Sequence, residues 1–193
     1  MAAEKLFEVW ARRNPNFEKK YEDTIIKQFT DYGKGSSSFQ ESRGKIYGAG
    51  YEIYIIAFFI GLYYNSRRKL NPDSSKIKGF GQPIMYWGGR ENRGFRKQYS
   101  DIQKYIFAAL VARSEVDFIA LDKGKMKVSK AADILIETME EYANFGFDYM
   151  DDKLGDNPDH FFKNSAFLDI FLSLSAEKTE SNTSDEEDVE SLD

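Results

Sequence analysis

The residues of this chain best suited to catalysis or metal binding are five closely spaced aspartates: Asp148, Asp151, Asp152, Asp156 and Asp159. Clustered carboxylates could hold Ca²⁺ or Mg²⁺, or could supply the acid and base of a small hydrolase. Their spacing differs from that of an EF-hand loop, and the final glutamate of that loop is missing. A general acid needs a pKa raised by burial, and these acids are expected on the surface. We therefore expect a solvated acidic turn here.

Two further carboxylate patterns have alternative interpretations. Tyr149-Met150-Asp151-Asp152 matches the Tyr-x-Asp-Asp tetrapeptide of reverse-transcriptase palms, where two carboxylates hold Mg²⁺. A palm also requires flanking strands and a longer chain, so a helix-terminal turn is favoured over a polymerase site. Glu52 is the one charged residue between Lys45 and Arg67. In the first turn of an apolar helix it is favoured as a helix-dipole or ion-pair partner rather than a catalytic acid.

Composition removes the common enzyme classes. Cysteine is absent, which excludes disulfides, thiolate metal sites and cysteine nucleophiles. His160 is the single histidine, so histidine-rich metal sites are excluded and little remains for a histidine-based triad. We therefore expect no catalytic residue, no metal and no cofactor, and an enzyme is less favoured than a binding protein.

Basic and acidic residues are segregated along the chain. Residues 1–100 hold 18 Lys or Arg against 10 Asp or Glu, and residues 101–193 hold 9 against 22. Such asymmetry indicates either a polyanionic partner or an acidic interaction tail. Within the basic half, nine cations in residues 67–97 are the candidate contacts to nucleic acid: Arg67, Arg68, Lys69, Lys76, Lys78, Arg90, Arg93, Arg96 and Lys97.

The apolar run that precedes this basic segment is too short to be a membrane span. Residues 51–64 would form a helix about 21 Å long, whereas a bilayer needs about 20 apolar residues. The first residues also lack the apolar core of a secretory signal. We therefore expect a soluble cytoplasmic protein in which this run is the central buried helix, with Arg67 at its end.

The remaining patterns predict a mainly α-helical fold in a single domain over residues 1–175. Helices are expected over 2–13, 16–31, 48–65, 101–113, 129–146 and from 157 to about 174. A short β-hairpin is expected where residues 116–121 face 126–128. Residues 176–193 hold eight acids and almost no apolar side chains, which predicts a disordered acidic tail.

Several short segments occur in an order typical of one bacterial family. They are Gly48-Ala49-Gly50, Ala57-Phe58-Phe59 with Leu62, the basic stretch, Trp87-Gly88-Gly89, and the helix 105–113. Over about residues 44–115 the chain resembles the small E subunit of the DNA phosphorothioation (Dnd sulfur modification) system. The resemblance implies a compact, oligomeric, non-catalytic accessory protein whose lysines and arginines contact duplex or nicked DNA. A subunit that carries no sulfur is also consistent with the absence of cysteine.

Three functions follow as alternatives. The first is a DNA-binding accessory of a prokaryotic DNA-modification or defence system, in which the basic segment contacts phosphates and the acidic tail competes for it. The second is a protein-interaction module with an aromatic helix as its subunit interface and the acidic tail as a recruiting segment. The third is a small hydrolase that uses Glu52 or the aspartates at 148–159.

Overall fold

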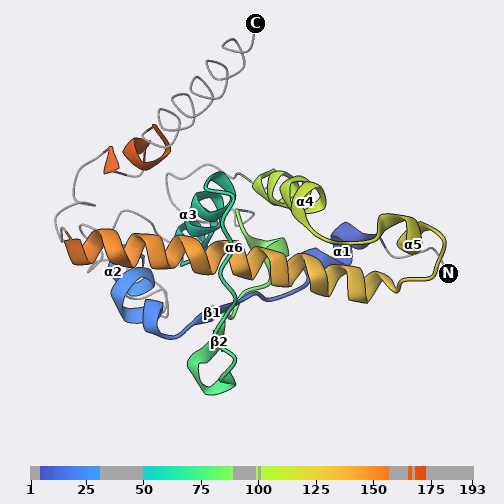
Figure 1. The fold of residues 1–193 in the computed structure, drawn as a ribbon, viewed down its shortest axis with the longest axis horizontal. Coiled ribbons are helices and arrows are strands. Elements are labelled where there is room, and N and C mark those ends of the chain that lie inside the picture. The colour runs from blue at the N-terminus through green and yellow to red at the C-terminus, as the bar shows by residue number, and fades with distance from the viewer. Residues whose placement is uncertain are drawn as a thin grey trace, which may run out of the picture.

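The computed structural model describes residues 5–30, 50–88, 99, 101–156, 165–166 and 168–172 and is mainly helical (Figure 1). Eleven elements follow one another in its longer stretches. They are α1 (Leu6–Ala11), β1 (Asn16–Glu18), the π-helix η1 (Glu22–Ile26), α2 (Lys27–Phe29), α3 (Gly50–Tyr63), the 3₁₀ turn η3 (Ser74–Lys76), β2 (Ile77–Gly79), the 3₁₀ turn η4 (Ile84–Tyr86), α4 (Ile102–Arg113), α5 (Phe118–Asp122) and α6 (Val128–Asp156). The long helix α6 runs the length of the molecule, and α1, β1, η1, α3 and α4 pack against it (Figure 1).

Helix α3 is the centre of the core, as the apolar run predicts. Tyr51, Tyr54 and Phe58 are fully buried on it. The Tyr51 ring stacks on Trp87 with centroids 5.7 Å apart, and Tyr54 meets Phe147 of α6 edge to face at 5.5 Å. Such aromatic pairs stabilise a fold beyond the area that they bury.

Two glycines allow α3 and α6 to cross with their backbones in contact. A Cβ atom on Gly146 of α6 would lie 1.9 Å from the Ala57 carbonyl oxygen of α3. A Cβ atom on Gly61 of α3 would lie 2.1 Å from the Tyr142 carbonyl oxygen of α6. Each helix therefore supplies a glycine where the other helix presents a carbonyl group, and no larger residue fits at either position.

The expected end of a helix near residue 146 is wrong, because α6 continues to Asp156. Gly146 lies on the buried face of α6 against α3. Close packing there outweighs the roughly 1 kcal/mol by which glycine disfavours a helix interior. The helix expected from residue 157 lies partly outside the described residues, since only 165–166 and 168–172 are described. The expected acidic tail, 176–193, lies outside them entirely.

The two-stranded sheet is present but is built from different residues than expected. β1 pairs antiparallel with β2, with Phe17 opposite Lys78. A helix was expected over 16–31, and of these residues 20–29 are helical, whereas 16–18 form β1. Asn16 donates its backbone N–H to Glu140 of α6, and its carbonyl accepts a hydrogen bond from Tyr54. These tertiary partners satisfy the Asn16 backbone outside a helix.

The hairpin expected over 116–128 is wrong. Residues 118–122 form the short helix α5, because the Asp117 side chain accepts a hydrogen bond from the Ala120 backbone N–H at 2.8 Å. An aspartate in that position caps a helix start.

Among the described residues, no helix has the length and apolar character needed to cross a membrane.

Candidate nucleic-acid interface

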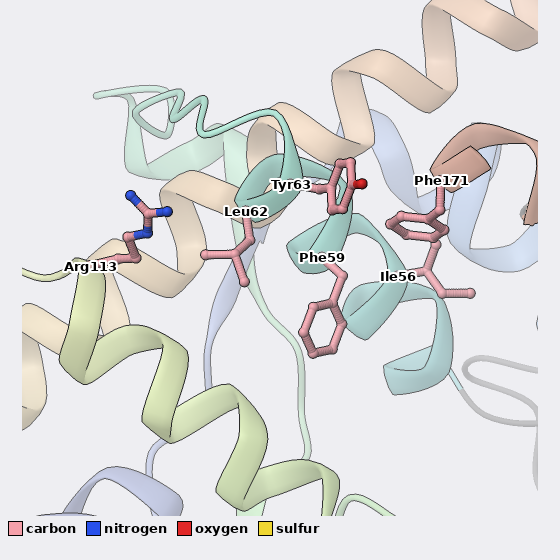
Figure 2. Close-up of a pocket in the computed structure, with 6 residues that line it drawn as sticks. All are labelled: Ile56, Phe59, Leu62, Tyr63, Arg113 and Phe171. Carbon is pink, nitrogen blue, oxygen red and sulfur yellow. The ribbon is translucent and has the colours of Figure 1, made fainter. Parts of the chain in front are cut away.

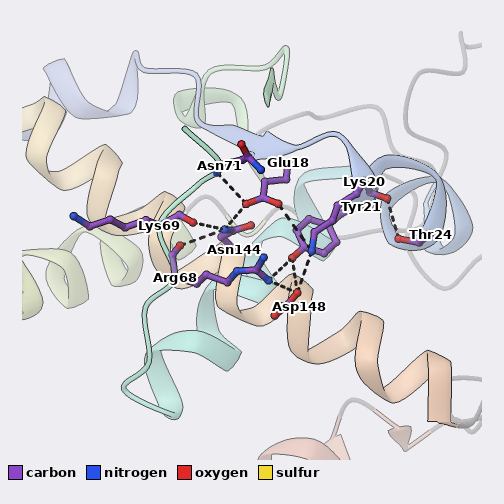
Figure 3. A network of polar contacts seen from close by, with 9 residues as sticks. All are labelled: Glu18, Lys20, Tyr21, Thr24, Arg68, Lys69, Asn71, Asn144 and Asp148. Atoms are coloured by element: carbon purple, nitrogen blue, oxygen red, sulfur yellow. Dashed lines mark hydrogen bonds and ion pairs between the residues drawn. The ribbon is translucent and has the colours of Figure 1, made fainter. Parts of the chain in front are cut away.

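The chain leaves α3 through Asn65, whose φ is +50°, and then lies across α6. The backbone N–H of Arg68 donates to the Glu141 carbonyl at 3.0 Å. The Asn144 side-chain amide donates to the carbonyls of Arg68 and Lys69 at 3.3 and 3.0 Å (Figure 3). Residues 67–69, the first three predicted cations, therefore follow the apolar helix α3 as expected, and hydrogen bonds to α6 also hold their backbone in place.

Arg68 belongs to a network of polar side chains around Asp148. The Asp148 carboxylate pairs with the Arg68 guanidinium and accepts hydrogen bonds from Tyr21 at 2.9 Å and Lys20 at 3.2 Å (Figure 3). Burial works to raise the pKa of Asp148, but the hydrogen bonds from Arg68, Tyr21 and Lys20 outweigh it and hold that pKa below its ordinary value. The pKa of Tyr21 is raised, by burial first and then by Asp148. These effects favour a carboxylate that stays charged and a tyrosine that stays neutral.

Glu18 extends the same network on its buried side. Its side chain is 7% exposed, and its carboxylate accepts hydrogen bonds from the Asn71 backbone N–H at 3.1 Å and the Asn144 amide at 3.0 Å. Through these contacts, residues 18–21 are joined both to the segment after α3 and to α6. The arrangement therefore fixes segments distant in sequence against one another, and it pairs the half-exposed Arg68 side chain with Asp148.

Two other predicted contacts are also engaged with acids. Arg67 lies 3.5 Å from the Glu115 carboxylate and 3.7 Å from that of Glu141. Lys78 donates to both carboxylate oxygens of Glu22 at 2.9 Å. The hydrogen bond from Lys78 is the main cause of the lowered pKa of Glu22. Their charge is therefore largely compensated at the surface.

Lys69 and Lys76 differ from these three cations. Both side chains are exposed, and neither ammonium forms an ion pair within the described stretches of the chain. Arg90, Arg93, Arg96 and Lys97 lie outside the described residues. The structure thus separates the described candidates into three that pair with acids and two that face solvent.

Comparisons with known proteins add no relative. No family model, curated protein or solved structure matches this chain.

The carboxylates considered as candidates for catalysis or metal binding lie in regular structure or are hydrogen-bonded within the fold. Asp151 and Asp152 lie within the regular helix α6, not in a turn between strands as in a polymerase palm. Glu52 accepts a hydrogen bond from the Tyr99 hydroxyl at 2.7 Å and is thereby engaged within the fold. Among the described residues, no group of three or more acidic or histidine side chains is placed to hold a metal ion. His160 and Asp159 lie outside the described residues.

An apolar groove opens beside α3. Its volume is about 490 Å³, and it is lined by Ile56, Phe59, Leu62, Tyr63, Arg113 and Phe171 (Figure 2). Arg113, from the last turn of α4, is the one charged residue of the lining and lies at the opposite end from Phe171 (Figure 2). The helix that was expected to be the buried centre of the fold is therefore only half-covered on this face.

Sequence reasoning missed a second group of cations. Lys123, Lys125, Lys127 and Lys130 are all exposed at the turn between α5 and α6. Four lysines within eight residues are a visible signal in the sequence. The structure brings them together because residues 123–127 form the turn between α5 and α6 instead of part of the expected hairpin.

Proposed function

We propose that this chain is a non-catalytic accessory protein that binds duplex or nicked DNA through phosphate contacts, within a prokaryotic DNA-modification or defence system. The proposal is supported by the charge segregation of the sequence and by the resemblance to the E subunit. The observation that carries it is that Lys69 and Lys76 face solvent while neighbouring cations are paired with acids. When exposed lysines of this kind bind DNA, they displace counterions from its phosphates, and no ion pair within the protein has to break first.

Lys69→Gln combined with Lys76→Gln is expected to weaken DNA binding and its dependence on salt. Each phosphate contact contributes about 0.9 to the slope of log K against log salt, so removal of two should reduce that slope by about 1.8. Fluorescence anisotropy of a labelled duplex of about two helical turns, titrated at several salt concentrations, measures this slope.

Lys27→Gln combined with Lys104→Gln is the matched control. Both lysines pair with an acid on their own helix or beside it, Asp23 for Lys27 and Asp101 for Lys104, and the change in net charge is the same. If the two double variants show the same decrease in affinity, the effect reflects net charge alone and the contact assignment is wrong.

A second candidate function, a protein-interaction module, is favoured by the apolar groove. The half-exposed residues of α3 and Phe171 offer a surface on which a second copy of the chain could dock. Aromatic residues in such a position commonly dominate an interface. The homo-oligomer expected from the resemblance would use this face.

Phe171→Ser is then expected to weaken self-association by about 2 kcal/mol, or roughly thirtyfold in Kd. Sedimentation equilibrium of the wild-type and variant proteins measures the change. Ile119→Ser is the control, because Ile119 is 69% exposed and lies outside the groove. A wild-type protein that stays monomeric at all concentrations tested would rule out this use of the groove.

A further inference from the structure

The turn between α5 and α6, together with the first residues of α6, presents four lysines to solvent. Lys123, Lys125, Lys127 and Lys130 are exposed, and none of them forms an ion pair within the part of the chain that the structure describes. Among the described residues, this is a denser group of unpaired cations than the two exposed lysines after α3. A charged group of this kind has no evident role in holding the fold together.

The turn is nevertheless well fixed. The Ala120 carbonyl accepts hydrogen bonds from the backbone N–H groups of Lys125 at 2.8 Å and Met126 at 3.0 Å. Gly124 has a φ of +67°, a conformation that glycine adopts without strain. Met126 packs against the core, and Val128 is half-buried. Lys125 and Lys127, on either side of Met126, are exposed.

Nearby acids offset little of this charge. Asp133 is engaged with the Arg13 guanidinium at 2.7 Å, and Asp117 caps α5. Asp122 is the remaining acid of the turn and is outnumbered by the four lysines. The 29-residue helix α6 also begins here, so its dipole adds partial positive charge on the same side.

We propose that this lysine turn, residues 122–130, is a second phosphate-contacting surface for the same DNA. The inference rests on the proposed function. Lys130 precedes Asn144, whose amide holds the Lys69 backbone, by 14 residues, or about 21 Å along α6. That separation is shorter than one turn of B-form DNA, about 34 Å, so a duplex of two turns is long enough to reach both groups of lysines.

The test uses the full-length chain and a labelled duplex of about two helical turns, with affinity measured by fluorescence anisotropy at several salt concentrations. Lys123→Gln/Lys125→Gln and Lys127→Gln/Lys130→Gln are measured separately and together. We expect the slope of log K against log salt to fall by about 0.9 for each phosphate interaction that is removed, and so by up to about 3.6 in the combined variant. The double variant Lys27→Gln/Lys104→Gln serves as the control for each pair, and circular dichroism checks that the variants fold.

The two possible failures are distinguishable. If wild-type protein binds DNA and the turn variants keep both the affinity and the slope of the control, the lysine turn does not contact DNA and the proposed function stands. If wild-type protein does not bind DNA at all, the proposed function and this inference are both overturned.

Discussion

Gly146→Ala is expected to lower the free energy of unfolding by about 3 kcal/mol or more. The new Cβ would lie 1.9 Å from the Ala57 carbonyl oxygen, far inside contact distance. The carbonyl belongs to the backbone of α3, and the Cβ is bonded directly to the backbone of α6, so neither atom can move like the end of a flexible side chain and the two helices must shift apart where they cross. Overpacking of a tight core typically costs about 1–3 kcal/mol, and a backbone clash belongs at or above the upper end. Urea denaturation followed by circular dichroism measures the decrease.

Gly155→Ala is the matched control on the same helix. A Cβ at this position meets nothing within 4 Å, so the substitution should be neutral or should stabilise α6 by up to about 1 kcal/mol. Gly61→Ala tests the crossing from the other helix, since its Cβ would lie 2.1 Å from the Tyr142 carbonyl oxygen. If all three variants are as stable as the wild type, the close crossing of α3 and α6 is wrong.

In the wild-type protein, Glu140 is expected to make the free energy of unfolding depend on pH by about 3 kcal/mol. Glu140→Gln is expected to remove this dependence. Burial raises the pKa of Glu140 to about 7, although hydrogen bonds from the Asn16 backbone N–H and side-chain amide to its carboxylate act to lower it. Repulsion from Glu137 adds to the increase. The pKa of Glu140 in the folded protein lies above the ordinary value of 4.5. The stabilising contribution of Glu140 to the free energy of unfolding is therefore fully present below about pH 4.5 and is lost as pH rises through 7.

Each unit of pKa shift corresponds to about 1.4 kcal/mol, which gives the expected size of the effect. Denaturant titrations of wild-type protein and Glu140→Gln from pH 5 to pH 8 should therefore give unfolding free energies whose difference changes across this range, with the variant gaining relative stability as pH rises. Glu8→Gln makes the same chemical change on an exposed carboxylate of α1 and should leave the wild-type dependence intact. A constant difference between wild type and Glu140→Gln would contradict the buried carboxylate.

The helical class and the central helix were predictable because they depend on local pattern. The apolar run at residues 51–64 holds a single charged residue, Glu52, so most of it is expected to be buried in a protein of this composition. The sheet and the full length of α6 were not predictable, because they depend on contacts between residues distant in sequence. Phe17 faces Lys78 across a long separation in sequence, and Gly146 reads as a helix end unless Ala57 is known to lie against it.

The candidate interface shows the same limit. Sequence identifies the cations in residues 67–78 but not their partners, because charge counting does not reveal that Arg68 lies on Asp148 or Lys78 on Glu22. Each of these pairs joins residues more than 50 positions apart. Only the fold separates a cation that stabilises the protein from one that is available to a ligand.

The most direct test of the central claim is the affinity of full-length wild-type protein for intact and nicked duplex DNA, measured by anisotropy across salt concentrations from about 50 to 200 mM. Contacts made by exposed lysines to phosphates predict measurable binding that weakens steeply and linearly in log salt, with little preference for base sequence. Absence of binding at the lowest salt, or an affinity that does not change with salt, would contradict a DNA-binding function for this chain.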